Sequence, residues 1–88
     1  MPHMEIDSLN TLIKAVETYR EDLATNRQML VNAGDACDMA MGSDDIVKKQ
    51  LAKLNEALEE LDKTAKLAEE VTEELIADRT KAIQVYED

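Results

Sequence analysis

The sequence predicts an all-α fold, an antiparallel hairpin of two helices, and three observations lead to this fold class. Apolar residues recur at alternating spacings of three and four along most of the 88 residues, which is the helical period. The chain has two Gly and one Pro, too few for the many turns of an all-β domain. Hydrophobic residues make up 44% and charged residues 34% of the chain, whereas aromatic residues make up 2%. Such a composition is typical of amphipathic helices that keep one face in water.

The first helix is expected over about residues 8–33. Its apolar stripe comprises Ile6, Leu9, Ile13, Val16, Leu23 and Leu30. The same series also includes Arg20 and Arg27, so the stripe narrows toward the connector. Gly34 stands where a left-handed residue commonly ends a helix.

The second helix is expected over about residues 44–86, after Ser43, which is a favourable N-cap residue. Its stripe alternates strictly between spacings of four and three, which is the period of a coiled-coil seam. The stripe comprises Val47, Leu51, Leu54, Leu58, Leu61, Ala65, Ala68, Thr72, Leu75, Arg79, Ala82 and Tyr86. No Gly or Pro interrupts it, so one continuous helix is expected.

A connector over residues 34–43 is expected to join the helices as antiparallel neighbours. Met39, Met41 and Gly42 form its turn, and the adaptable methionines are expected to fold back over the hairpin core, with partner binding as the alternative. Cys37 is the only cysteine, so no internal disulfide can form. It is expected to be a small apolar residue of the connector rather than a reactive thiol.

The position of the turn sets the pairing of the two helices. With the turn centred near residue 40, Leu61 is expected to lie opposite Tyr19. Helix two should then extend beyond helix one after about residue 73, and the apolar residues of that extension would be left uncovered.

Two helices bury little apolar surface, so the hairpin is expected to pair into a four-helix bundle. Both helices carry a second apolar flank, with Leu12 and Tyr19 on the first and Leu67, Val71 and Ile76 on the second. Pairing with itself as a homodimer and pairing with a similar hairpin as a heterodimer both remain open. The residues expected at the interface are Leu9, Val16, Leu23, Leu30, Val47, Leu51, Leu54, Leu58, Leu61, Ile76, Ile83 and Tyr86.

The charges and motifs argue against most chemical functions. The net charge of −10 disfavours nucleic acid as a partner, and no apolar run is long enough to cross a membrane. No catalytic, metal-binding or cofactor-binding constellation is evident, since the single histidine, His3, lies at the extreme N-terminus. Residues 1–4 are expected to be a cloning remnant or a disordered start, and residues 5–88 a single hairpin domain.

An acidic face is expected on the second helix. It comprises Glu69, Glu70, Glu73, Glu74 and Asp78. Carboxylates four residues apart on a helix repel each other. The face is therefore either a solvated surface or a docking surface for a basic partner.

Two long helices joined near Ala40-Met41-Gly42, followed by a tail that contains Ile83 and Tyr86, resemble the WXG-motif (early-secreted-antigen-like) proteins of type VII secretion. The chain is also similar to the small helical partners of LXG toxins. Ala40 replaces the Trp of the family's turn motif, and Glu87 and Asp88 follow Tyr86 where the family has Tyr-x-x-x-Asp/Glu.

The resemblance implies a non-enzymatic secretion substrate or targeting partner that acts as a dimer. Its partner would be a similar hairpin or the helical N-terminal region of a toxin. The resemblance also implies a location in the bacterial cytoplasm, with export that needs no cleaved signal peptide as an alternative. A cytoplasmic adaptor or effector chaperone that binds a basic client through the acidic face is the second hypothesis.

Overall fold

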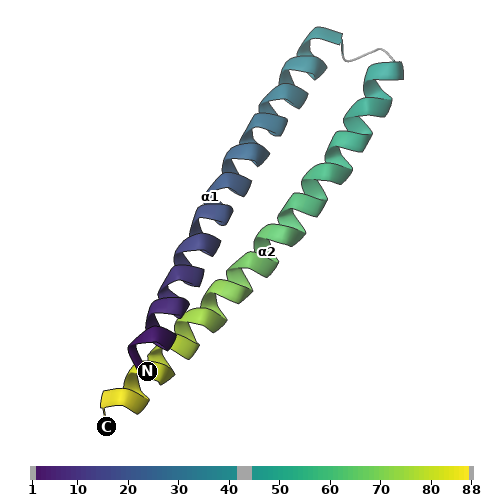
Figure 1. Cartoon of the computed structure of the whole chain (residues 1–88). Coiled ribbons are helices and arrows are strands. Elements are labelled where there is room, and N and C mark those ends of the chain that lie inside the picture. The colour runs from purple at the N-terminus through teal and green to yellow at the C-terminus, as the bar shows by residue number, and fades with distance from the viewer. Residues whose placement is uncertain (1, 42–44, 88) are drawn as a thin grey trace. The chain divides into compact units, whose positions relative to one another are not determined.

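Two long α-helices make up the part of the chain that the structure describes. This computed structural model describes the backbone of residues 2–41 and 45–87, and the side chains of residues 5–38 and 45–85. Helix α1 spans Pro2–Met41, with 40 residues, and helix α2 spans Asp45–Glu87, with 43 residues. No strand is present in these two ranges. The helices pack against each other, which confirms the predicted all-α hairpin (Figure 1).

Helix α1 is longer at both ends than the sequence predicted. It continues through Gly34 to Met41, and no described residue has the left-handed backbone expected at Gly34. One Gly inside a helix costs only about 1 kcal/mol, which packing against α2 can offset. Residues 2–4 are helical rather than disordered, and Pro2 suits the first helical position, where its missing N–H has no partner to lose.

Most of the predicted connector is therefore helical. Met39 and Met41 belong to the last turn of α1, and their side chains lie outside the described residues. Gly42 lies outside them altogether, as does the predicted capping of the core by this turn. Cys37 is half-buried on α1 rather than in a connector.

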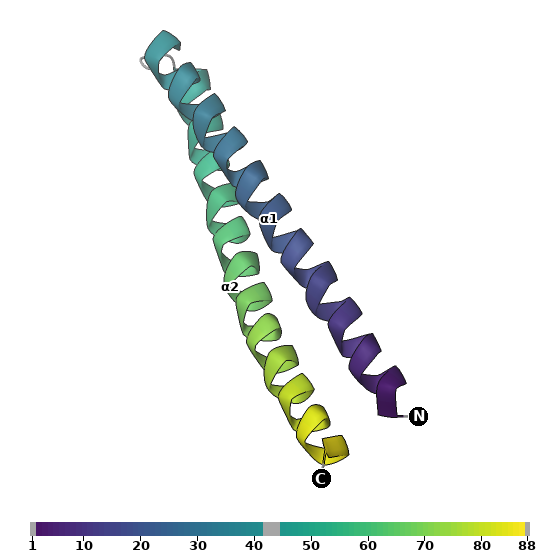
Figure 2. The ribbon, with the colours of Figure 1, turned by 90° about the vertical axis from the view of Figure 1, so that its left-hand side faces the viewer.

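The hairpin consists of two units, each with one part of α1 against one part of α2. Unit 1 comprises Met1–Glu21 and Lys66–Asp88, and unit 2 comprises Asp22–Ala65. In both units the two helices lie side by side (Figures 1 and 2).

Polar contacts fix the pairing of α1 with α2 inside each unit. In unit 1, the Arg79 guanidinium donates a hydrogen bond to Asn10 Oδ1 at 3.0 Å. In unit 2, Arg27 Nε donates to Asp62 Oδ1 at 2.7 Å. The partner of Arg27 thus lies about nine residues further along α2 than a turn near residue 40 implies, because α1 continues to Met41.

The shifted pairing removes the predicted extension of α2 beyond α1. Glu5 and Leu9 of α1 line a groove in unit 1 together with Ala82 and Val85 of α2. Since α1 begins at Pro2, it reaches the C-terminal part of α2, and Ala82 is buried.

The seam between the helices is thinly buried. The buried apolar residues are Ile13, Leu23, Ala68 and Ala82, and no large side chain among the described residues is fully buried. The seam positions from Val47 to Ala82 are those that the heptad pattern predicts, each half-buried or buried. Thr72 occupies one of them at 5% exposure.

Replacing Thr72 with valine is expected to raise the free energy of unfolding by about 0.5–1 kcal/mol. The Thr72 hydroxyl donates to the Ala68 carbonyl at 2.8 Å, and in an α-helix that carbonyl also accepts the Thr72 amide. Removing the hydroxyl therefore leaves no buried group unpaired and adds apolar surface to the seam. Thermal unfolding followed by circular dichroism measures the change.

Thr80→Val is the matched control for this substitution. The Thr80 hydroxyl makes the same type of bond, to the Ile76 carbonyl at 3.0 Å, but Thr80 is exposed. We expect this variant to unfold like the wild type. A large loss of stability in Thr72→Val would mean that the buried hydroxyl is needed.

Candidate interaction surface

Most residues predicted as an interface lie between α1 and α2 of the same chain. Leu23 is buried there, and eight others are half-buried: Leu9, Val16, Leu30, Val47, Leu51, Leu54, Leu58 and Leu61. Ile76 and Ile83 are exposed, and the side chain of Tyr86 lies outside the described residues. Contact of any of these residues with a second chain stays a prediction.

Gly34 lets the two helices of unit 2 approach closely. A Cβ atom placed on Gly34 would lie 2.8 Å from Leu54 Cδ2 and 3.8 Å from Leu51 Cδ2. Gly34 thus occupies a seam position of α1, opposite two leucines of α2. The predicted helix end at Gly34 is therefore wrong, although a lone Gly after a long apolar pattern is the usual sign of a helix end.

An exposed apolar strip lies beside the seam of unit 1, and we call it the apolar flank. Its residues are Leu12 (51% exposed), Tyr19 (49%), Leu67 (60%) and Val71 (36%). Leu12, Tyr19 and Val71 directly precede residues 13, 20 and 72 of the seam, and these three seam residues occupy the same position of the heptad. In an antiparallel pair such positions lie on the same side of the seam, and Leu67 lies one helical turn before Val71.

Between residues 8 and 19, the α1 side of the apolar flank has no charged residue. The exposed positions on this side are Ser8, Thr11, Leu12, Ala15, Thr18 and Tyr19, and the exposed Glu5 lies one heptad before Leu12. The hydroxyls of Thr11 and Thr18 donate to the carbonyls of Asp7 and Lys14, at 2.9 and 3.1 Å. These hydroxyls already have partners within the helix, so burying this surface would leave them satisfied.

The acidic residues predicted as a face are all exposed on α2 in unit 1. They are Glu69, Glu70, Glu73, Glu74 and Asp78. Neither ion pair recorded among the described residues involves them. Glu70 and Glu74 follow Leu67 and Val71 by three residues each, so they adjoin the outer edge of the apolar flank. Asp78 follows Val71 by seven residues and so continues the row of Val71 beside the seam, where it lines a groove with Glu5 and Leu9 of α1.

Replacing Glu73 with lysine is expected to raise the free energy of unfolding by about 0.5–1 kcal/mol at low salt. The change removes the repulsion between Glu69 and Glu73 and places a cation four residues after a carboxylate. Urea unfolding at two salt concentrations measures the gain, which should shrink at the higher one. The control is Glu73→Gln, which removes the repulsion alone and should give about half the effect. No gain in either variant would mean that the carboxylates do not repel each other measurably.

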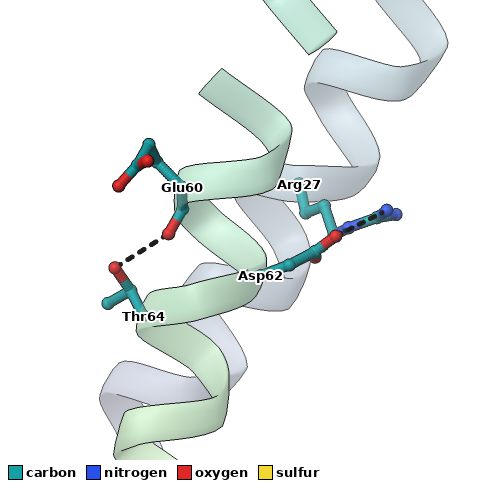
Figure 3. Close-up of polar contacts among 4 residues, drawn as sticks. All are labelled: Arg27, Glu60, Asp62 and Thr64. Carbon is teal, nitrogen blue, oxygen red and sulfur yellow. Dashed lines mark hydrogen bonds and ion pairs between the residues drawn. The ribbon is translucent and has the colours of Figure 1, made fainter. Parts of the chain in front are cut away.

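Arg27 and Asp62 form an ion pair across the seam of unit 2 (Figure 3). Two hydrogen bonds join the side chains, at 2.7 Å from Nε and 3.4 Å from the terminal nitrogen. The bond to Asp62, and then its charge, raise the pKa of the Arg27 guanidinium. Both side chains are about half exposed, at 45% and 55%, so the pair orients the helices more than it stabilises them.

The contacts of Arg27, Asn10 and Arg79 were not predicted from the sequence. The available signal was a charged residue at a seam position, which needs a polar partner on the facing helix. Within α2, Lys63 bonds to Glu60 at 3.3 Å. The Thr64 hydroxyl donates to the Glu60 carbonyl at 3.0 Å (Figure 3).

Within the part of the chain that the structure describes, no three His, Cys, Asp or Glu side chains are grouped so that they could hold a metal ion. Neither described helix is long and apolar enough to cross a membrane. Comparisons with protein-family models, with curated proteins and with solved structures found no match.

Proposed function

We propose that the chain is a non-enzymatic protein–protein interaction module that functions as half of a four-helix bundle. The observation that carries this proposal is the thin core. In the described residues, the seam of two helices of 40 and 43 residues buries four apolar side chains, two of them alanines. Such a core leaves a hairpin of this size with little stability of its own.

We propose type VII secretion as the setting in which this module functions. The hairpin of two long helices is the architecture that the WXG-motif resemblance implies, and residues 40–42 and Tyr86 carry the resemblance in sequence. The chain would then be a small substrate or a targeting partner that pairs with a similar hairpin or with the helical N-terminal region of a toxin. It would reside in the bacterial cytoplasm before any export.

A second candidate is an adaptor or effector chaperone that binds a basic client. The observation that favours it is the group of five exposed carboxylates on α2. Binding through this face alone would depend strongly on salt, because exposed charges are screened within about 10 Å at 0.1 M ionic strength. A bundle formed through apolar surface would depend on salt much less.

Light scattering after size-exclusion chromatography, over a dilution series, tests the interaction module. The expected result is either a species of twice 9.9 kDa that survives dilution or a monomer with a broad, low-temperature thermal transition. Both results indicate a hairpin that needs a second pair of helices. A monomer with a sharp transition above roughly 65 °C, beyond the usual range for small domains, would contradict the proposal.

A further inference from the structure

We propose that the apolar flank of unit 1 binds a basic amphipathic helix from a different protein, whose lysines and arginines pair with Glu70, Glu74 and Asp78. This inference rests on the proposed interaction module and specifies the chemistry of its partner. The apolar flank is the surface defined by Leu12, Tyr19, Leu67 and Val71, which are between 36% and 60% exposed.

The flank is suited to receive a helix because its two sides are formed by parallel ridges. Leu12 and Tyr19 are seven residues apart on α1, and Leu67 and Val71 are four residues apart on α2. One apolar stripe of a third helix, repeating at three and four residues, matches both spacings. Leu12 and Tyr19 lie about 10 Å apart along the axis at 1.5 Å per residue, so a partner of three to four turns covers them.

Burying the α1 side of the flank costs little because two of its hydroxyls already have partners and no charged residue lies on this side between residues 8 and 19. On α1 the hydroxyls of Thr11 and Thr18 are bonded to carbonyls of the same helix. Between residues 8 and 19, Ser8 and Ala15 are the other exposed residues on this side beside Leu12 and Tyr19, and none of these residues is charged. A partner helix therefore needs apolar side chains, and no buried charge, where it meets α1.

The α2 side of the flank is acidic, and this determines the charge expected of the partner. Glu70 and Glu74 are exposed along its outer edge, Asp78 is exposed one heptad after Val71, and within unit 1 Lys81 is the exposed cation that follows them. The edge therefore carries a net negative charge directly beside Leu67 and Val71. Lysines or arginines on the matching edge of the partner would pair with these carboxylates and speed association.

A second copy of the chain fits this surface less well. It would bring a further net charge of −10 and the same three carboxylates to the interface. A two-fold interface contacts the same surface on both chains, so the acidic edges of both copies would be concentrated around one apolar contact. Like charges brought together in this way oppose association, whereas a basic partner relieves the repulsion.

A pair of designed helical peptides tests the inference on the full chain. Both peptides carry leucines at alternating spacings of three and four, and one has lysines on the edges of that stripe where the other has glutamates. Fluorescence anisotropy measures their affinities at about 50 mM and about 500 mM NaCl. We expect the lysine peptide to bind at least about tenfold more tightly than the glutamate peptide at low salt, and to retain measurable binding at high salt.

Variants of the chain separate the apolar contribution from the charged one. Leu12→Ser should weaken binding of the lysine peptide by about tenfold at both salt concentrations. Glu74→Lys should weaken it at low salt only. Ile83→Ser is the matched control, because Ile83 is also 36% exposed. Ile83 directly follows the seam residue Ala82, so it lies on the opposite side of the seam from the apolar flank. It should leave binding unchanged.

Two outcomes would overturn the inference. If the chain alone forms a dimer that Leu12→Ser dissociates, a second copy occupies the flank, and the interaction module survives while this partner does not. If Leu12→Ser leaves binding of the lysine peptide unchanged, the peptide is held by charge alone. Failure of the interaction module itself has a different signature, a stable monomer with a sharp thermal transition that binds neither peptide.

Discussion

Replacing Ile13 with aspartate is expected to unfold the hairpin, because the change lowers the free energy of unfolding by about 4–5 kcal/mol. Ile13 is 5% exposed in the seam of unit 1. A carboxylate at this position loses the apolar contacts of the isoleucine and is held out of water. A core in a chain of this size seldom supplies more than about 3–5 kcal/mol, so the loss is comparable with the whole stability. Circular dichroism through a thermal ramp measures the loss of helix.

The adjacent residue provides the matched control. Leu12→Asp introduces the same charge at the next position of α1, but Leu12 is 51% exposed on the apolar flank. We expect this variant to keep the helical signal of the wild type and to lose affinity for a partner. If both variants unfold to the same degree, Ile13 does not face α2 more closely than Leu12 does.

Replacing Gly34 with valine is expected to lower the free energy of unfolding by about 1–3 kcal/mol. The first added carbon would lie 2.8 Å from Leu54 Cδ2, and the valine methyls would extend further toward α2. Leu54 must leave its position or the helices of unit 2 must separate. Urea unfolding measures the loss.

Two further variants show whether the loss comes from this contact. Gly34→Ala gains about 1 kcal/mol of helix propensity and needs only a small shift of the Leu54 methyl, so its stability should stay within about 0.5 kcal/mol of the wild type. If Gly34 ended α1 in a left-handed conformation, the alanine would instead cost roughly 1–2 kcal/mol. The double variant Gly34→Val with Leu54→Ala should lose less than the two single changes together, since each relieves the other. Additive losses would mean that the two residues do not touch.

The helical content and the seam could be predicted from the sequence because both depend on local spacing. Positions three and four residues apart share one face of a helix whatever the rest of the chain does. The stripe from Val47 to Ala82 is accordingly the face of α2 that the structure buries. The exposure of Leu12, Tyr19, Leu67 and Val71 beside the seam follows from the same rule.

The helix ends and the pairing of the helices could not be predicted in this way. A Gly after a long apolar pattern has the same local signature whether it ends the helix or contacts a facing leucine. Gly34 does the second, because Leu51 and Leu54 of α2 fill the space that its missing side chain leaves. Because α1 continues to Met41, each residue of α1 lies opposite a later residue of α2 than the sequence predicted.

The sequence by itself thus determined that two amphipathic helices form, which of their residues face inward, and that the chain is strongly acidic. Only the tertiary structure decided which residues meet across the seam, as in the pair of Arg27 with Asp62 and the pair of Asn10 with Arg79. The physical reason is that periodicity constrains each helix separately. The offset between two helices is decided by contacts between residues 35 and 69 positions apart, which no local pattern encodes.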